Sequence, residues 1–295
     1  MNSNEPISPP MYDKSPAEII DHVQVATGYF RMMLAAPAIA AAAQPGHFVH
    51  IMTRPGSLYD PLLRRAFSIM QAEEGNIEIL YRVEGKGTLL MSQWQRGYNV
   101  DLLGPLGSPF ALEAPYAVLV GGGVGIPPMV MMASRRAPDN TNRDRGSPRS
   151  TIALIGVRSS NELICIEDFA RYQVPVAVAT DDGSVGHHGF VTELLKQHLE
   201  QAAQEAVLPT VFACGPLPML RAVASLCTRY NAPCQVSLEE NMPCGVGVCN
   251  GCVVPVQGSG DDYSRYRRIC VEGPVLWAHE VDWSHYSAAC LSTPD

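Results

Sequence analysis

The sequence predicts a multidomain protein with an antiparallel β-barrel domain, an α/β domain built on a parallel sheet, and a small cysteine-rich module. Alternation of apolar and polar residues gives way after Ala117 to short apolar runs separated by helical segments, and regular patterns end near Val236. At 295 residues the chain is long enough for two compact domains and a small module. We place the three units at residues 17–113, 114–235 and 236–295.

The first unit is punctuated by proline and glycine and has a period of two, the pattern of a strand with one buried face. The alternation is clearest at Ile77, Ile79, Tyr81 and Val83. Repeated short strands separated by turns predict an antiparallel barrel.

The second unit contains four short apolar runs, which we expect to be strands of a parallel sheet. These runs are 117–120, 151–157, 174–179 and 211–213, and the helices expected beside them are 127–135, 191–206 and 218–230. The wholly polar segment 138–150 predicts a mobile loop inside this unit.

Charge and hydropathy exclude several classes of function. The formal net charge of -8 argues against a nucleic-acid partner, because phosphate binding needs clustered Lys and Arg. Residues 114–134 carry no charge, but three consecutive glycines and two adjacent prolines at their centre would break a membrane-spanning helix, so we expect a buried strand, turn and helix. The start of the chain lacks a basic and then apolar pattern, so we expect no secretory signal, no membrane and a cytoplasmic location.

Four of the nine cysteines have a spacing that predicts a metal site. Cys244, Cys249 and Cys252 follow the pattern C-x4-C-x2-C, and Cys270 comes later, as in plant-type [2Fe–2S] proteins. A four-cysteine zinc site is the main alternative, although zinc sites more often use two separated C-x2-C pairs, and a disulfide is a weaker one. The remaining cysteines except Cys214 have no such spacing, and we treat them as packing residues: Cys165, Cys227, Cys234 and Cys290.

Two glycine turns follow predicted strands of the second unit and precede predicted helices. One is the run Gly121, Gly122, Gly123, Val124 and Gly125. This context suits a dinucleotide pyrophosphate, which needs a close approach of the backbone and a helix N-terminus. The run does not match G-x-G-x-x-G, so a purely structural turn is the alternative.

The second turn is formed by Cys214, Gly215 and Pro216. Because ligands bind beyond the carboxyl ends of strands in open parallel sheets, both turns are expected to line one crevice. A buried thiol at a strand end is the alternative for Cys214.

Two segments of the first unit suit a flavin dinucleotide. Arg64 and Arg65 stand beside Phe67 and Ser68, and an arginine can grip phosphate, an aromatic can cover a ring, and a serine can hydrogen-bond the reactive edge of a flavin. Residues 81–88 place a glycine turn directly after the alternating strand, where its amides could meet a pyrophosphate. Each segment alone is also compatible with an ordinary barrel strand and turn.

Together these segments resemble the ferredoxin reductase superfamily, and most closely the electron-transfer subunits of class 1B dihydroorotate dehydrogenases. The matching segments, in family order, are 60–69, 81–88, 104–107, 121–128, 213–216 and 237–252. Two departures are Ala66, where the family commonly has proline, and the polar insertion before Ser150.

The resemblance implies three cofactors: FAD, NAD and a [2Fe–2S] cluster. It assigns FAD binding to Arg65, Ala66, Phe67, Ser68, Leu80, Tyr81, Arg82, Gly87 and Thr88. It assigns nicotinamide nucleotide binding to Gly121, Gly122, Gly123, Gly125, Cys214, Gly215 and Pro216, and the cluster to Cys244, Cys249, Cys252 and Cys270. Ser68 and Cys214 are the predicted catalytic residues.

The resemblance also implies a partner and a reaction. The partner is an FMN-containing catalytic subunit that oxidises dihydroorotate in pyrimidine biosynthesis, with the whole assembly a heterotetramer. Electrons would cross the cluster one at a time to FAD, which passes hydride to NAD+. The alternatives are a reductase subunit of a hydrogenase, sulfide-reducing or transhydrogenase complex, and a zinc-stabilised interaction module without redox chemistry. Arg158 could meet a 2′-phosphate, whereas Asp181 and Asp182 would repel one, and solvated loop charges are the alternative for these residues. We therefore favour NAD over NADP mainly by the resemblance.

Overall fold

The computed structural model describes residues 13–56, 58–137, 150–258 and 263–286. The first domain is a closed barrel with the strand order β1-β2-β5-β4-β3-β6. Its strands are β1 (Asp13–Ala26), β2 (Tyr29–Ala35), β3 (Phe48–Ile51), β4 (Arg65–Glu73), β5 (Asn76–Arg82) and β6 (Asn99–Leu106), and its helices are α1 (Pro37–Ala42) and α2 (Lys86–Met91). All neighbouring strands of the barrel are antiparallel, which confirms the predicted barrel.

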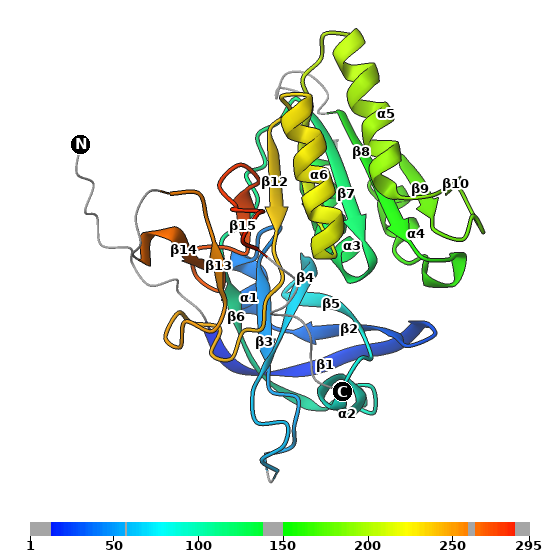
Figure 1. Ribbon diagram of the computed structural model, residues 1–295. Coiled ribbons are helices and arrows are strands. Elements are labelled where there is room, and N and C mark those ends of the chain that lie inside the picture. Colours follow the sequence, from blue (N-terminus) through cyan, green and yellow to red (C-terminus); the bar gives the residue numbers. More distant parts are fainter. Residues whose placement is uncertain (1–12, 57, 138–149, 259–262, 287–295) are drawn as a thin grey trace.

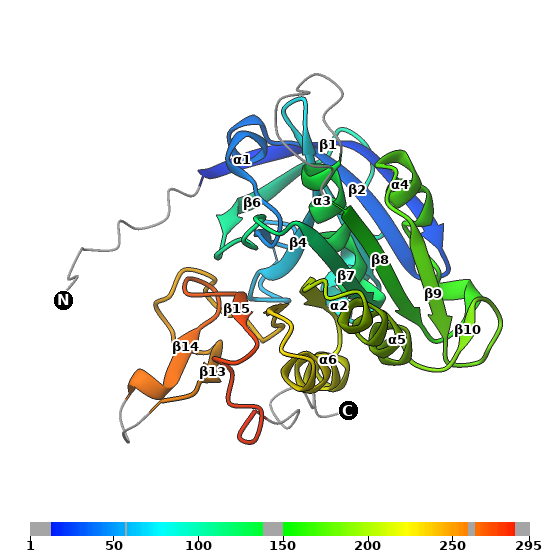
Figure 2. The same cartoon turned by 90° about the horizontal axis from the view of Figure 1, so that it is seen from above.

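The second domain is a parallel sheet between two layers of helices (Figure 1). Its strands, in the order β10-β9-β8-β7-β11-β12-β15, are β7 (Tyr116–Gly122), β8 (Ser150–Val157), β9 (Val176–Thr180), β10 (His187–His188), β11 (Thr210–Cys214), β12 (Cys234–Ser237) and β15 (Val275–Trp277). Its helices are α3 (Ile126–Arg136), α4 (Ile166–Arg171), α5 (Val191–Gln204) and α6 (Leu217–Arg229). Figure 2 shows α3 and α4 on one face of the sheet and α5 and α6 on the other.

The predicted strands and helices of the second domain are confirmed, with ends that shift by at most two residues. The uncharged stretch 114–134 forms the buried strand β7, a turn and most of helix α3, as expected. In the part of the chain that the structure describes, no helix has the length and apolar character needed to cross a membrane. The predicted loop 138–150 lies, apart from Ser150, outside the described residues, and so does Cys290.

The C-terminal module packs between the barrel and the edge of the sheet (Figure 1). It contains the antiparallel pair β13 (Val253–Pro255) and β14 (Tyr266–Arg268), and it contributes β15 to the sheet as an antiparallel neighbour of β12. Strand β12 spans residue 235, where we placed the boundary between the second and third units. The module therefore shares a sheet with the domain before it.

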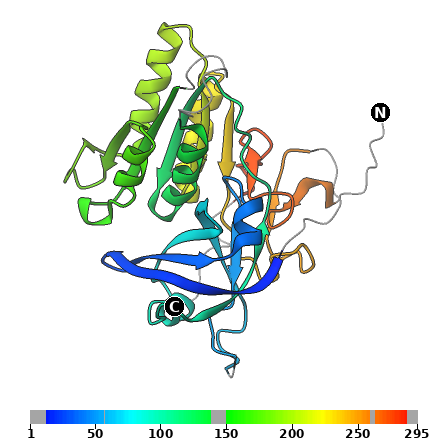
Figure 3. The ribbon, with the colours of Figure 1, turned by 180° about the vertical axis from the view of Figure 1, so that it is seen from behind.

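The β5 strand is confirmed, but both of its faces are buried. Ile77, Ile79 and Tyr81 point into the barrel core, whereas Glu78 and Leu80 face the second domain and are covered by it. The long β1–β2 hairpin lies beneath the second domain (Figure 3). Covering by this domain explains why the outer face of β5 is not solvated.

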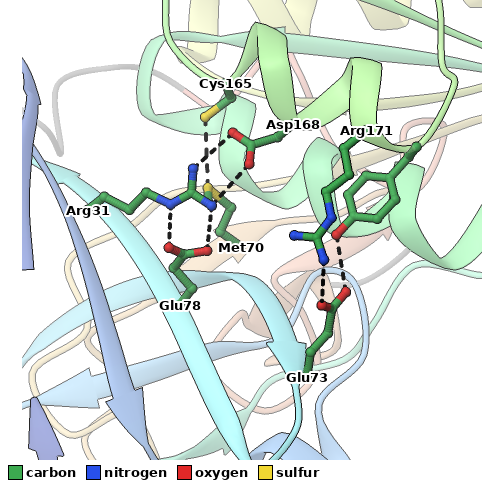
Figure 4. Close-up of polar contacts among 8 residues, drawn as sticks. Arg31, Met70, Glu73, Glu78, Cys165, Asp168 and Arg171 are labelled. Atoms are coloured by element: carbon green, nitrogen blue, oxygen red, sulfur yellow. Dashed lines mark hydrogen bonds and ion pairs between the residues drawn. The ribbon is translucent and has the colours of Figure 1, made fainter. Parts of the chain in front are cut away.

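An ion-pair network joins the two large domains at this interface. Arg31 of β2 lies between Glu78 of β5 and Asp168 of α4, and Figure 4 shows its guanidinium facing both carboxylates. A second and more exposed set at the same interface joins Arg171 and Tyr172 to Glu73. These contacts fix the barrel relative to the sheet, and so fix the two halves of the site described next.

Candidate flavin, nucleotide and cluster sites

The residues predicted to bind FAD lie on neighbouring elements of the barrel. The first four are on β4, the next three end β5, and Gly87 and Thr88 are in the first turn of α2. Arg65, Ala66 and Ser68 are at least partly exposed, so their side chains can meet a ligand. The rings of Phe67 and Tyr81 lie inside the barrel with centroids 5.8 Å apart. These two residues can therefore contact a ligand only through their main chain.

Polar atoms without partners gather where the pyrophosphate of FAD is expected. A side chain on Gly87 would come within 2.8 Å of Thr53 Oγ1, and the Arg65 side chain also lies against this glycine. Thr53 Oγ1 and Arg54 Nε are buried and have no hydrogen-bond partner among the described residues. Because buried polar groups are almost always satisfied, this cradle fits a phosphate-bearing ligand.

Thr88 stabilises the turn beside this cradle. Its hydroxyl accepts hydrogen bonds from the main-chain N–H of Glu84 at 3.0 Å and Gly85 at 3.2 Å. The residues present therefore fit FAD, with Arg65 and the first turn of α2 as the candidate contacts for its phosphates.

A cavity of about 770 Å³ opens at the carboxyl edge of the parallel sheet. Gly122, Gly123, Gly215 and Pro216 line it from the sheet, and Arg82 lines it from the barrel. The glycine turn and the Cys214–Pro216 turn therefore meet in one crevice, as predicted, because β7 and β11 are adjacent at the point where the strand order reverses.

Gly121 and Gly125 lie behind this cavity wall. A Cβ on Gly125 would stand 2.3 Å from the main-chain oxygen of Cys214, so only glycine allows the first turn to pack on the second. Cys214 itself is buried, does not line the cavity, and its thiol pKa is raised by burial.

One charged residue of the cavity was not predicted from the sequence. Glu239 follows β12 and lines the cavity with an exposed side chain; the protein around it, together with the charge of Glu84, raises the pKa of its carboxyl above the usual value. The far end of the cavity is lined by Asp181, Phe190 and the ion pair of Arg158 with Glu162. Glu239 falls in the family-like segment 237–252, which is the signal that could have found it.

The four predicted cluster cysteines come together as two pairs. Cys252 and Cys270 are hydrogen-bonded to each other, which lowers the pKa of Cys252 to about 6 and raises that of Cys270. Cys244 is hydrogen-bonded to Cys249; burial raises the pKa of Cys244, but main-chain N–H groups and Cys249 lower it to about 7 overall. Low thiol pKa values favour the thiolate that iron binds.

Main-chain donors also face the sulfurs of the pairs. Gly247 donates its N–H to Cys270 Sγ at 3.2 Å, and Gly251 donates to Cys249 Sγ at 3.4 Å. Within the described residues no three His, Cys, Asp or Glu side chains surround one point where a single metal ion could bind. A [2Fe–2S] cluster instead takes two thiolates at each of two irons, so two pairs fit it.

The cluster loop rests on a buried histidine that sequence reasoning missed. His50 of β3 is fully buried, and neither ring nitrogen has a hydrogen-bond partner among the described residues. Burial, with the charge of Arg64 acting in the same direction, lowers the pKa of His50 to about 4. A single histidine in a strand gives no periodic or spacing signal, so nothing local in the sequence pointed to it.

A flavin-type barrel, a nucleotide cavity at a sheet edge and a four-cysteine loop define an NAD-linked oxidoreductase subunit that uses FAD and an iron–sulfur cluster. Comparison with known proteins agrees. Residues 239–282 match the family described as the iron-sulfur cluster binding domain of dihydroorotate dehydrogenase B, and residues 119–225 match the oxidoreductase NAD-binding domain.

Curated relatives specify the family. The chain is 38% identical over 264 residues to the dihydroorotate dehydrogenase B (NAD(+)) electron transfer subunit of Bacillus caldolyticus, covering 87% of this chain and 94% of that one. It is 35% identical over 271 residues to the protein of the same name from Desulforamulus reducens, covering 90% and 97%. The chain therefore belongs to the family of dihydroorotate dehydrogenase B electron transfer subunits.

A solved structure of an NADH-dependent reduced ferredoxin-NADP oxidoreductase is also similar. It superposes with a TM-score of 0.73 at 27% identity and covers 92% of this chain and 91% of its own. The likeness extends over the barrel, the sheet and the module together.

Proposed function

We propose that this chain relays electrons from a separate dihydroorotate dehydrogenase catalytic subunit to NAD+. The observation that carries the proposal is the position of β4, which bears the flavin-binding residues. Its neighbour β3 supports the cluster loop through His50, and helix α3 of the nucleotide domain packs on β4 from the other side. Strands β3 and β4 thus lie between the cluster loop and helix α3 of the nucleotide domain.

The chain's residues have distinct roles in this proposal. Arg65, Gly87 and Thr88 hold the FAD phosphates, and the Gly122 and Gly215 turns admit the nicotinamide nucleotide. When bound, FAD exchanges a hydride with nicotinamide and single electrons with the cluster. Ser68 hydrogen-bonds the flavin edge, and Cys214 shapes the nicotinamide side from behind the cavity wall.

We assign the nucleotide as NAD because of the charges at the far end of the cavity. Asp181 lines the cavity and would repel a 2′-phosphate. The guanidinium of Arg158 is already paired with Glu162 at 2.9 Å, which leaves it less able to bind such a phosphate. Oxidation rates with NADH and NADPH test this assignment, and a preference for NADPH would overturn it.

We propose that the partner is an FMN-containing subunit in a heterotetramer, and that it docks over the cluster loop. Val248 is 79% exposed and Cys249 beside it is also exposed, so the cluster would lie near the surface there. A cluster near the surface gives single electrons a short path between the subunits. Reduced thiols of this kind also suit the cytoplasm, where we place the assembly.

The test is an anaerobic absorption spectrum of the purified chain titrated with NADH, with iron and flavin assayed on the same sample. Flavin and iron–sulfur bands that bleach together would support the relay. A protein that stays colourless after reconstitution with FAD, iron and sulfide would refute it.

A second candidate is a reductase subunit of a different redox complex. The structural likeness to the NADH-dependent reduced ferredoxin-NADP oxidoreductase favours it, because that likeness spans nearly the whole chain. Purification of the native complex separates the two candidates: an FMN-containing partner supports the first, and any other redox partner supports the second.

A further inference from the structure

His50 lies between the strand predicted to bind FAD and the cluster loop. It lies on β3 directly opposite Ala66 of β4, the strand predicted to bind FAD. Val49 and Ile51 on either side of it point into the barrel core, so His50 points outward with Phe48. The C-terminal module covers this outer face.

The cluster loop packs directly on the imidazole. A Cβ on Gly245 would come within 2.5 Å of His50 Nδ1 and 2.7 Å of its Cε1, so the loop can approach this closely only with glycine, and Gly245 has a φ of 71° that also favours glycine. The main-chain carbonyl groups of Met242 and Cys244 also face the ring, close enough to raise its pKa in opposition to burial, although neither forms a hydrogen bond of good geometry with it. His50 therefore touches the loop next to its first cysteine.

Packing alone does not explain a histidine here. An apolar residue would fill the same place beside Phe48, whose ring centroid is 6.2 Å from that of His50. A neutral imidazole carries one N–H donor, and a buried donor without a partner is rare in native proteins. The sulfurs of the adjoining cluster loop are acceptors for such an N–H. Hydrogen bonds to these sulfurs are a main determinant of the potential of such clusters.

We propose that His50 is a positioning residue for the iron–sulfur cluster, supporting the loop at Gly245 and donating its single N–H to a sulfur of the cluster or of Cys244. The bond favours the reduced cluster, which carries one more negative charge. His50 thereby adjusts the potential of the cluster relative to that of the flavin on the adjoining strand. The proposal rests on the relay proposed above and adds a residue that tunes it.

The experiment compares His50→Leu, His50→Asn and His50→Gln in the full chain loaded with FAD and cluster. Leucine keeps the bulk but removes the donor, whereas the amide nitrogen of asparagine or glutamine approximates Nδ1 or Nε2. The readouts are the cluster potential and the EPR spectrum of the reduced cluster, with flavin content as the measure of folding. The control is His47→Gln, since His47 Nδ1 accepts a hydrogen bond from Gln44 in its own loop.

We expect His50→Leu to shift the reduction equilibrium about tenfold toward the oxidised cluster, equivalent to about 59 mV for one electron, and to change the EPR spectrum. One of the two amide variants should restore the potential, and His47→Gln should leave it unchanged. A wild-type potential in His50→Leu would overturn the proposal, as would a leucine-like potential in both amide variants.

Loss of the cluster from all three His50 variants with flavin retained would also overturn it, since His50 would then act only in packing. If only His50→Leu loses the cluster, a wild-type potential in one amide variant supports the proposal. Absence of iron from the wild-type chain would instead contradict the proposed function, so the two failures are distinguishable.

Discussion

Replacing Arg31 by methionine should weaken the contact between the barrel and the nucleotide domain by about 3 kcal/mol. The Arg31 Nη2 atom lies 2.7 Å from Glu78 Oε2 and 3.0 Å from Asp168 Oδ1 (Figure 4). The two carboxylate side chains are only 8% and 11% exposed. Without the guanidinium, both negative charges would remain close together at a buried interface.

The magnitude follows from the burial of this network. Breaking a buried ion pair by removing one partner costs about 3–5 kcal/mol, because the charge left behind has lost its hydration. The side chain of Arg31 is 27% exposed, so water screens part of the loss and the lower end of the range applies. Methionine retains most of the apolar stem, which limits the change to the charge.

The assay is urea denaturation followed by tryptophan and flavin fluorescence. With a slope of about 3 kcal/mol per molar urea, the transition that includes the interface should move down by about 1 M. Glu73→Gln is the matched control, because its ion pair with Arg171 spans the same interface but the two side chains are 45% and 60% exposed. That change should cost less than about 1 kcal/mol.

Equal and small shifts for Arg31→Met and Glu73→Gln would refute this reasoning, since burial would then make no difference. A further variant removes all three charges by adding Glu78→Leu and Asp168→Leu. It should recover much of the loss, because apolar groups of similar size avoid the desolvation of charge.

Three other changes test separate parts of the molecule. The pKa of Glu239 is raised from 4.5 to about 7, so its ionisation removes stability as the pH rises through this window. Glu239→Gln should therefore raise the melting temperature more at pH 8 than at pH 5, and equal shifts would contradict this. Gly125→Ala should destabilise the chain by about 1–3 kcal/mol and weaken NADH binding, because its Cβ would meet the Cys214 carbonyl group. Calorimetry measures the stability and titration measures the binding of NADH. Wild-type values for both would contradict the close packing. Cys249→Ser should abolish the EPR signal of the cluster but leave flavin reduction by NADH intact, whereas Cys165→Ser should keep both; a normal signal in the first would remove Cys249 from the ligands.

Apolar patterns in the sequence predicted most of the fold. The runs that became β7, β8, β9 and β11 are short and uncharged because these strands are buried or half-buried on both faces over most of their length. The short strand β15 was not anticipated. Its three residues carry no periodic signal, and its partner β12 lies far away in the sequence.

The sequence predicted the positions of the sites better than the arrangement of the residues within them. Spacing predicted the four cysteine ligands, because a cluster fixes the distances between its ligands along a loop, but it did not predict that they form two pairs. For Tyr81 the alternation with Ile77 and Ile79 already indicated an inward side chain, and the structure has the ring in the barrel core. His50 could not be found from a local pattern, since its role depends on contacts that form only when distant segments pack, and for Glu239 the family-like segment 237–252 was the available signal.

The position of β15 has a consequence for how the protein is made. Ribosomal synthesis delivers β12 about forty residues before β15, and the intervening chain contains all four cluster cysteines. Until β15 arrives, the edge of β12 is left with unpaired backbone groups, which is the state in which sheets associate with other chains. Iron loading before release from the ribosome would bring the two ends of this segment together, so starvation for iron should appear first as aggregation of newly made chains.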